Sequence, residues 1–409
     1  MGFGHGNNPI KIRRSNQASI LRMIYQFGPI TRSEIAEQLG LTMPTITTNV
    51  NTMIERGLVH EVGSPDNAAK YLGRKPRLID IVPDSRYFLG AEMQKNQRRL
   101  CVADYSGKIV KKLADYTTHN DYESNIRCLC KMISRLIEEC RDESISISGI
   151  GIAVPGLVNR EEGILNIHPG YNWQDKAISI DISELTGYTG PVYLENNACA
   201  RAFSAQLFNK ELLDSEETIA YLFVSTGIAC PMINGFSASN ALMGEGEIGH
   251  MVMNPKGPRC RCGNRGCLEA YSSDRSVISQ CEKAAKTGKA PALASLCKEH
   301  MQPDLSLILK AQEQRDEEIC RIIHNAVTTL GIGIANIDNF ARPHTVLIEG
   351  QLFTREENRS LLLKTINENL YTSLGKYAIS RFLFVEPAEY GGALGGAAVA
   401  IRKNLDNYI

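Results

Sequence analysis

Three cysteines stand within one eight-residue segment, Cys260-Arg-Cys-Gly-Asn-Arg-Gly-Cys267, and no other part of the chain restricts the fold as strongly. Its glycines and charged residues differ from the apolar surroundings of cysteines buried as small hydrophobic residues or of an isolated redox pair. Three thiolates and one imidazole form the closed tetrahedral set of a structural zinc, without an open catalytic position. We therefore predict Zn²⁺ bound by Cys260, Cys262 and Cys267, with His250, His168 or Glu269 as the fourth ligand.

The first eighty residues predict a helix-turn-helix followed by a hairpin. Apolar residues recur at helical spacing over residues 15–27. Thr31-Arg-Ser-Glu34 has the form of a capping box for a second, short helix, and Gly40 is placed for the turn after it. Thr42 is placed to cap a third helix. Two strands at Val59–Val62 and Leu78–Val82 would complete a winged domain over residues 1–82.

The third helix carries two faces of different chemistry. Its apolar residues, from Ile46 to Ile54, recur at helical spacing and predict a buried face. The opposite face is short, polar and uncharged, which suits close approach to base edges in the major groove. The basic loop between the strands suits phosphate or minor-groove contact, although a solvated loop has the same composition. We predict DNA contacts by Pro44, Thr45, Thr47, Thr48 and Asn51 on the helix and by Arg74 and Lys75 on the loop.

Charge is divided unevenly along the chain. Residues 1–82 hold ten Lys or Arg and six Asp or Glu, whereas the whole chain is neutral, so the remainder is acidic. A basic N-terminal part on an acidic body favours double-stranded DNA as a partner of residues 1–82, and an accidental surface distribution is the alternative.

Residues 83–409 predict an α/β domain. Pro83-Asp-Ser85 is expected to act as a hinge, and strands and helices then alternate to the C-terminus. The chain lacks an apolar run of the roughly 18 residues that would span a bilayer, and its N-terminus lacks the apolar core of a signal peptide. We therefore expect a cytoplasmic protein without membrane insertion.

These motifs together resemble the ROK family, specifically its transcription-factor branch, which includes xylose and N-acetylglucosamine repressors. The most specific match is Glu247-Ile-Gly-His250 followed by Cys260 to Glu269. The resemblance implies a two-lobed, actin-like sugar-kinase fold after the winged domain, a zinc loop at residues 250–267, and His250 as the fourth zinc ligand. It also implies a sugar site formed by Gly156, Asn172, Asn196, Asn197, Glu247, His250 and Glu269.

Three departures from the kinases of the family bear on catalysis. Residues 92–97 lack the glycines of a phosphate-binding loop, and Ile228-Ala-Cys-Pro231 stands where a second such loop is expected. Asn197 stands where the kinases carry the aspartate that removes a proton from the sugar, and an amide cannot act as that base. We therefore predict a protein that is not an enzyme and that has no catalytic residues.

The combined expectation is a sugar-responsive transcriptional repressor of carbohydrate-utilisation genes. It would bind a DNA operator as a homodimer or homotetramer and take a sugar or sugar phosphate as effector. Two alternatives remain. One is a repressor sequestered by a protein partner such as a sugar transporter, and the other is an active sugar kinase with an appended DNA-binding head.

Overall fold

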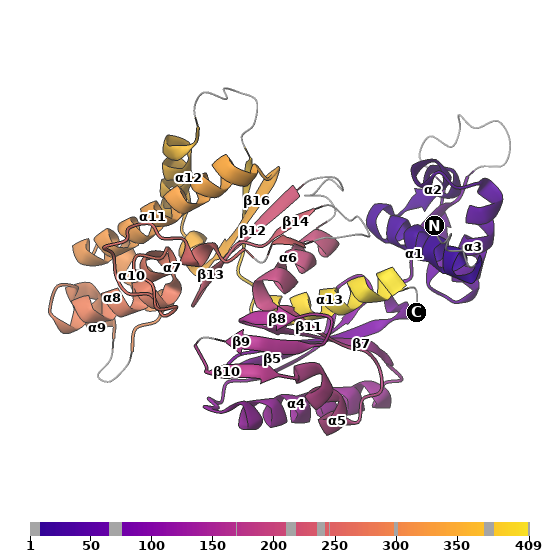
Figure 1. Cartoon of the computed structure of the whole chain (residues 1–409), viewed down its shortest axis with the longest axis horizontal. Helices are drawn as coiled ribbons and strands as arrows, with labels where there is room; N and C mark the ends of the chain where they lie inside the picture. Colours follow the sequence, from indigo (N-terminus) through magenta and orange to yellow (C-terminus); the bar gives the residue numbers. More distant parts are fainter. Residues whose placement is uncertain are drawn as a thin grey trace, which may run out of the picture. The chain divides into compact units, whose positions relative to one another are not determined.

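The computed structural model describes residues 9–64, 76–168, 170–209, 218–234, 242–244, 246–297, 302–371 and 380–407. Their contacts divide into two units (Figure 1). The first unit holds the described residues up to Asn209 and those from Tyr390 onward, and the second holds those from Thr218 to Glu389. The N-terminal residues belong to the same unit as the sheet that follows them. None of the helices in these ranges is long and apolar enough to cross a membrane.

The N-terminal residues form a winged helix-turn-helix. Both halves of the predicted capping box are present, since the side chains of Thr31 and Glu34 each bond the other residue's backbone N–H. Gly40 ends the second helix in the left-handed conformation, with φ of 61°, which a residue with a Cβ seldom adopts. The elements are α1 (Pro9–Phe27), β1 (Ile30–Thr31), α2 (Arg32–Leu39), α3 (Met43–Glu55), β2 (Val59–Gly63) and β3 (Leu78–Ile81), with sheet order β1-β3-β2.

A five-stranded sheet forms the body of the first unit. Its order is β11-β7-β4-β5-β6, and β4 lies parallel to β7 and antiparallel to β5. Helices α13 and α6 cover one face, and α4 and α5 lie on the other (Figure 1). The elements are β4 (Tyr87–Met93), β5 (Arg98–Asp104), β6 (Ile109–Asp115), α4 (Tyr122–Asp142), β7 (Ile147–Val154), α5 (Ile178–Thr186), β11 (Val192–Asn196), α6 (Asn197–Phe208) and α13 (Gly391–Asn407).

Glycines allow α13 to lie directly on this sheet. A Cβ on Gly90 of β4 would collide with the backbone of Ala393, and one on Gly151 of β7 would collide with that of Gly396. Helix α13 is therefore the element that covers the middle strands.

A small antiparallel sheet, of order β10-β9-β8, follows β7. It consists of β8 (Leu157–Asn159), β9 (Ile164–His168) and β10 (Trp173–Lys176). The rings of His168 and Tyr171 stack with centroids 3.8 Å apart, and Trp173 meets Tyr171 edge-on. His168, one candidate for the fourth zinc ligand, is thus a buried partner in an aromatic cluster.

The second unit has a six-stranded sheet with helices that share its apolar core. β12 and β17 both pair in parallel with β16. Helix α11 (Glu317–Ala341) begins where the Asp316 side chain caps it by accepting from the Ile319 N–H. The strands are β12 (Thr218–Val224), β13 (Ile228–Ala229), β14 (Met232–Asn234), β15 (Leu242–Gly244), β16 (Thr345–Gly350) and β17 (Arg381–Val385). The helices are α7 (Glu269–Ser272), α8 (Asp274–Lys286), α9 (Pro291–Leu296), α10 (Leu305–Glu313), α11 (Glu317–Ala341) and α12 (Glu356–Asn369).

The winged domain and the first sheet share one hydrophobic core. Tyr25 of α1 meets Tyr105 edge-on at 5.5 Å, and the Tyr105 hydroxyl lies 3.1 Å from Asn404 Oδ1 on α13. Arg22 of α1 pairs with Asp406 of α13 at 3.2 Å. The predicted hinge is itself a 3₁₀ turn, Pro83–Ser85, whose first carbonyl accepts from the Tyr105 N–H. The head is therefore packed against α13 rather than connected only by a linker.

Candidate functional sites

Helix α3 presents the predicted polar face to solvent. Ile46, Val50 and Met53 are fully buried, whereas Ile54 is only half-buried. The members of the predicted reading face differ in exposure: Pro44, Thr48 and Asn51 are exposed, and Thr45 and Thr47 are half-buried. Thr42 precedes the helix as predicted, but its hydroxyl bonds that of Thr45 at 2.9 Å and makes no backbone cap.

Two residues near this face were not predicted. Met43, the first residue of α3, has 44% of its surface exposed although it is apolar. Arg32, the first residue of α2, donates to Asn51 on α3 and to Glu61 on β2. Arg32 lies inside the capping box, and its partners are 19 and 29 residues away along the chain, so the local pattern carries no signal for these contacts. Arg74 and Lys75 lie outside the described residues.

Four predicted metal ligands converge in the second unit. The ligand atoms of His250, Cys260, Cys262 and Cys267 all lie within 4.8 Å of one another. The Cys262 and Cys267 sulfurs are 3.7 Å apart, as are Cys260 Sγ and His250 Nδ1. A disulfide would need about 2 Å, whereas two ligands at about 2.3 Å from a tetrahedral zinc lie about 3.8 Å apart. The residues present therefore fit a tetrahedral metal ion.

Local backbone geometry brings the sulfurs together. The Cys260 N–H donates to the Asn264 carbonyl at 2.8 Å, which closes the turn through Gly263 at φ of 97°. Gly266 also has positive φ, and a Cβ there would collide with the backbone of Asn254. The two glycines are thus required by this loop.

The thiols differ in their readiness to ionise. Burial raises the pKa of Cys267 to about 12, and the neighbouring thiols act in the same direction. Burial also opposes ionisation of Cys262, but hydrogen bonds at the Asn264 backbone and at the two other thiols outweigh it and lower that pKa. Ionisation of the Cys262 thiol is therefore favoured over that of Cys267.

Within the first unit, two predicted sugar residues meet. Asn196 ends β11 and caps α6, where its Oδ1 accepts from the Ala198 N–H at 2.9 Å. Its Nδ2 donates to the Gly156 carbonyl at 2.9 Å, so the Asn196 amide is occupied by backbone partners. Asn197 is half-buried at the start of α6. Asn172 is exposed, with φ of 55°, just before β10, where it closes the turn between β9 and β10.

The remaining predicted sugar residues lie in the second unit. Glu247 is exposed, and its carboxylate is 3.9 Å from His250 Nε2, the ring nitrogen opposite the one that faces Cys260. Glu269 is buried at the start of α7 and faces Arg261 of the cysteine loop at 3.7 Å. Glu269 is therefore paired with an arginine, and His250 completes the cysteine cluster.

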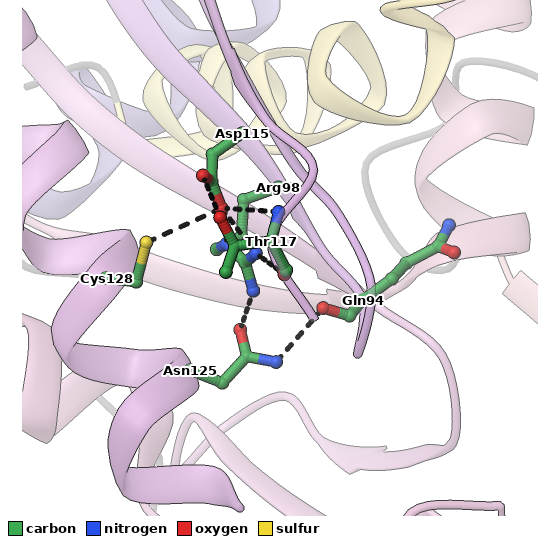
Figure 2. A network of polar contacts seen from close by, with 6 residues as sticks. All are labelled: Gln94, Arg98, Asp115, Thr117, Asn125 and Cys128. Atoms are coloured by element: carbon green, nitrogen blue, oxygen red, sulfur yellow. Dashed lines mark hydrogen bonds and ion pairs between the residues drawn. The ribbon is translucent and has the colours of Figure 1, made fainter. Parts of the chain in front are cut away.

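The hairpin between β4 and β5, where the kinases have a phosphate loop, is closed by side chains. The fully buried Arg98 binds Asp115, the Thr117 carbonyl and Asn125 (Figure 2). Asn125 in turn donates to the Gln94 carbonyl at 3.0 Å (Figure 2). The turn between β4 and β5 is therefore fixed by a hydrogen-bond network centred on the buried Arg98.

Glu92, the acidic residue just before this hairpin, has partners within the chain. It is 1% exposed, and its Oε1 lies 3.5 Å from Arg201 and accepts from Gln94 Nε2 at 3.2 Å. A Cβ on Gly392 would collide with the Glu92 carboxylate, so this group lies against the first turn of α13. The positive end of that helix and the arginine both stabilise the carboxylate.

The second expected phosphate loop is likewise not open. Ile228 and Ala229 pair with β12 as strand β13, and Ile228 is buried. The Glu269 carboxylate lies beside the preceding turn, since its Oε2 would be 3.0 Å from a Cβ on Gly227, and the Asp274 backbone N–H donates to the Ser225 carbonyl at 2.8 Å. Burial raises the pKa of Asp274 to about 7.

Comparisons with known proteins cover nearly the whole chain. The xylose repressor of Bacillus subtilis (strain 168) is 27% identical over 400 residues, 97% of each protein. The DNA-binding transcriptional dual regulator NagC of Escherichia coli (strain K12) is 25% identical over 405 residues, 97% of this chain and 95% of that protein.

Solved structures show the same fold. A ROK family transcriptional regulator described as a homolog of the E. coli MLC protein superposes with a TM-score of 0.79, at 23% identity over 97% of both chains. A ROK glucokinase from Streptomyces griseus, solved with glucose and AMPPNP, superposes with a TM-score of 0.63, at 20% identity over 77% of this chain and 99% of that chain.

Family matches fall on either side of the predicted boundary at residue 82. Residues 14–68 match the MarR family, which corresponds to the winged helix-turn-helix, and residues 88–403 match the ROK family. The chain therefore belongs to the ROK family and carries a MarR-like winged helix-turn-helix ahead of its ROK domain.

Proposed function

We propose that this protein is a DNA-binding transcriptional repressor whose ROK domain responds to a sugar. The observation that carries this proposal is the exposed polar face of α3 on a winged domain that shares its hydrophobic core with the ROK sheet. Such a face suits the major groove, and a shared core can transmit a change from one part to the other. The names of the xylose repressor and of NagC support a regulatory role.

The effector class proposed is a sugar or sugar phosphate. In the first unit the Gly156 backbone and the Asn197 amide, and in the second unit the Glu247 and Glu269 carboxylates, are groups of the kinds that bind a polyol. Asn196 would act by holding the Gly156 loop, since its own amide is bonded to the backbone.

The four-residue cluster would bind a structural zinc ion. His250 would bind it through Nδ1, which leaves Nε2 facing Glu247. A carboxylate on the free nitrogen of a metal-bound histidine fixes the ring orientation. The ion would supply rigidity to the segment that carries Glu247 and Glu269.

We further propose that the ROK domain does not transfer phosphate. Asn197 cannot accept the proton of a sugar hydroxyl near neutral pH. The Glu92 carboxylate is turned to Arg201 and to the end of α13, and the two expected phosphate loops are an arginine-braced hairpin and a strand. A coupled ADP-release assay with several hexoses and pentoses should detect no sugar-dependent turnover. Turnover that Asn197→Ala abolishes would contradict this proposal.

A gel-shift titration tests the repressor function. An operator fragment from the protein's own genomic neighbourhood would be titrated with the full chain, with and without D-xylose, glucose, N-acetylglucosamine and their phosphate esters. We expect specific binding that one member of this panel changes at least tenfold. Binding that no member changes would contradict sugar sensing, and binding no stronger than to random duplex would contradict the DNA-binding role.

A further inference from the structure

We propose that Arg32 fixes Asn51 of the reading helix as a hydrogen-bond donor, so that this position of α3 selects guanine rather than adenine. The proposal rests on the DNA-binding function above and adds a residue that determines specificity.

Arg32 connects three elements of the winged domain. From the start of α2, its Nη1 donates to Glu61 Oε1 on β2 at 2.9 Å, and its Nη2 donates to Asn51 Oδ1 on α3 at 3.3 Å. Only 19% of the Arg32 side chain is exposed, although the bonds lie at the surface. Arg32 therefore sits between the reading helix and the strand that leads into the wing.

The orientation of the Asn51 amide follows from this contact. A guanidinium has donors and no acceptor, so the amide atom that faces it must be the carbonyl oxygen. The two N–H donors of Asn51 Nδ2 then point away from Arg32, on a residue that is exposed to solvent. Glu61 pairs with the other terminal nitrogen of the guanidinium, Nη1, and so holds the group in place.

This orientation determines which base edge Asn51 can bind well. Adenine recognition by asparagine uses the amide as donor and acceptor together, toward N7 and N6. An amide whose oxygen already binds Arg32 offers mainly donors, and guanine presents two adjacent acceptors, O6 and N7, in the major groove. Guanine is therefore the favoured partner.

A direct phosphate contact by Arg32 is the competing role. Its charge is already matched by Glu61 at 2.9 Å, so a phosphate would have to displace a carboxylate. Loss of a phosphate contact lowers the salt slope of binding by about one and weakens all sequences equally, whereas loss of amide orientation changes base preference. The two roles thus predict different measurements.

The experiment selects binding sites from a random duplex library with the full-length chain. The proteins compared are wild type, Arg32→Lys, Asn51→Ala, their double variant, and Arg13→Lys as a matched control on an exposed arginine of α1. Lysine keeps the charge but loses the two-armed geometry. Melting curves establish that each variant is folded. A further variant, Glu61→Gln, weakens the ion pair that positions Arg32 while leaving Arg32 and Asn51 themselves unchanged.

We expect one position of each half-site to prefer guanine in the wild type by at least about fivefold. Arg32→Lys and Asn51→Ala should both reduce that preference to less than twofold, at unchanged salt slope, and the double variant should be no worse than Asn51→Ala alone. Glu61→Gln should weaken the preference partly, and Arg13→Lys should leave it intact.

Three results would overturn the proposal: adenine at the position that Asn51→Ala affects, an unaltered preference in Arg32→Lys, or additive effects in the double variant. A wild-type chain that enriched no sequence would contradict the proposed function as well.

Discussion

At the scale of single residues, the cysteine cluster is the feature whose loss has the broadest consequence. The four ligand atoms lie at distances that suit one tetrahedral ion. We expect Cys262→Ser, which changes an exposed ligand and leaves no cavity, to lose bound zinc and lower the melting temperature, because metal binding is coupled to folding. Metal analysis and thermal unfolding measure both. Cys297→Ser, outside the cluster, is the matched control, and equal zinc content in the two variants would refute the assignment.

The raised pKa of Asp274 predicts that the stability of the fold depends on pH. Its folded pKa is about 7 because of burial, against 3.8 for the exposed group. The folded state therefore holds this proton more tightly, and its stabilising effect is present below pH 4 and lost as the pH rises toward 7. Asp274→Asn removes the titration, so we expect its stability to match wild type near pH 4 and to exceed it at pH 8, by at most about 4 kcal/mol. Urea unfolding of both proteins near pH 4 and at pH 8 tests this. A stability difference between them that is the same at the two pH values would contradict it.

At the scale of elements, α13 joins the head to the ROK sheet. It packs on β4, β7 and α6 and also contacts α1. Leu405 of α13 is fully buried in the core shared with the head. We expect Leu405→Ala to lower the free energy of unfolding by about 2–5 kcal/mol. We also expect it to speed amide hydrogen exchange in α1.

The control for this element is Leu362→Ala in α12, which empties a fully buried position in the core of the second unit. It should lower stability by a similar amount while α1 exchange stays slow. Equal exchange of α1 in both variants would show that α13 does not hold the head.

At the scale of the whole molecule, the proposed function requires reciprocity. If a sugar changes operator affinity by some factor, the operator must change sugar affinity by the same factor, because binding free energies are linked. Calorimetric titration of the effective sugar, with and without saturating operator, measures both sides of this cycle. Unequal factors would mean that the sugar acts at a different step or on a different assembly.

We also expect the chain to act as a two-fold dimer. Two winged heads related by such symmetry read half-sites about one helical turn apart. Light scattering on the protein–operator complex should give an even number of chains, and insertion of five base pairs between half-sites should abolish tight binding by turning them to opposite faces of the duplex.

The features that the sequence determined by itself are those that depend on residues close together along the chain. The capping box at Thr31, the left-handed turn at Gly40 and the spacing of the cysteine loop each depend on residues a few positions apart, and all three are confirmed in the fold. The α/β class and the winged domain follow from the same short-range patterns, and the family comparisons bear them out.

Only the tertiary structure decided which residues meet across long stretches of chain. The pairing of Arg32 with Asn51 and Glu61, of Glu92 with Arg201, and of α1 with α13 joins positions up to 384 residues apart. Hydrophobic periodicity records which face of an element is buried but not the element that covers it. Packing decides that question, which is why the sequence placed a hinge at Pro83 where the fold has a shared core.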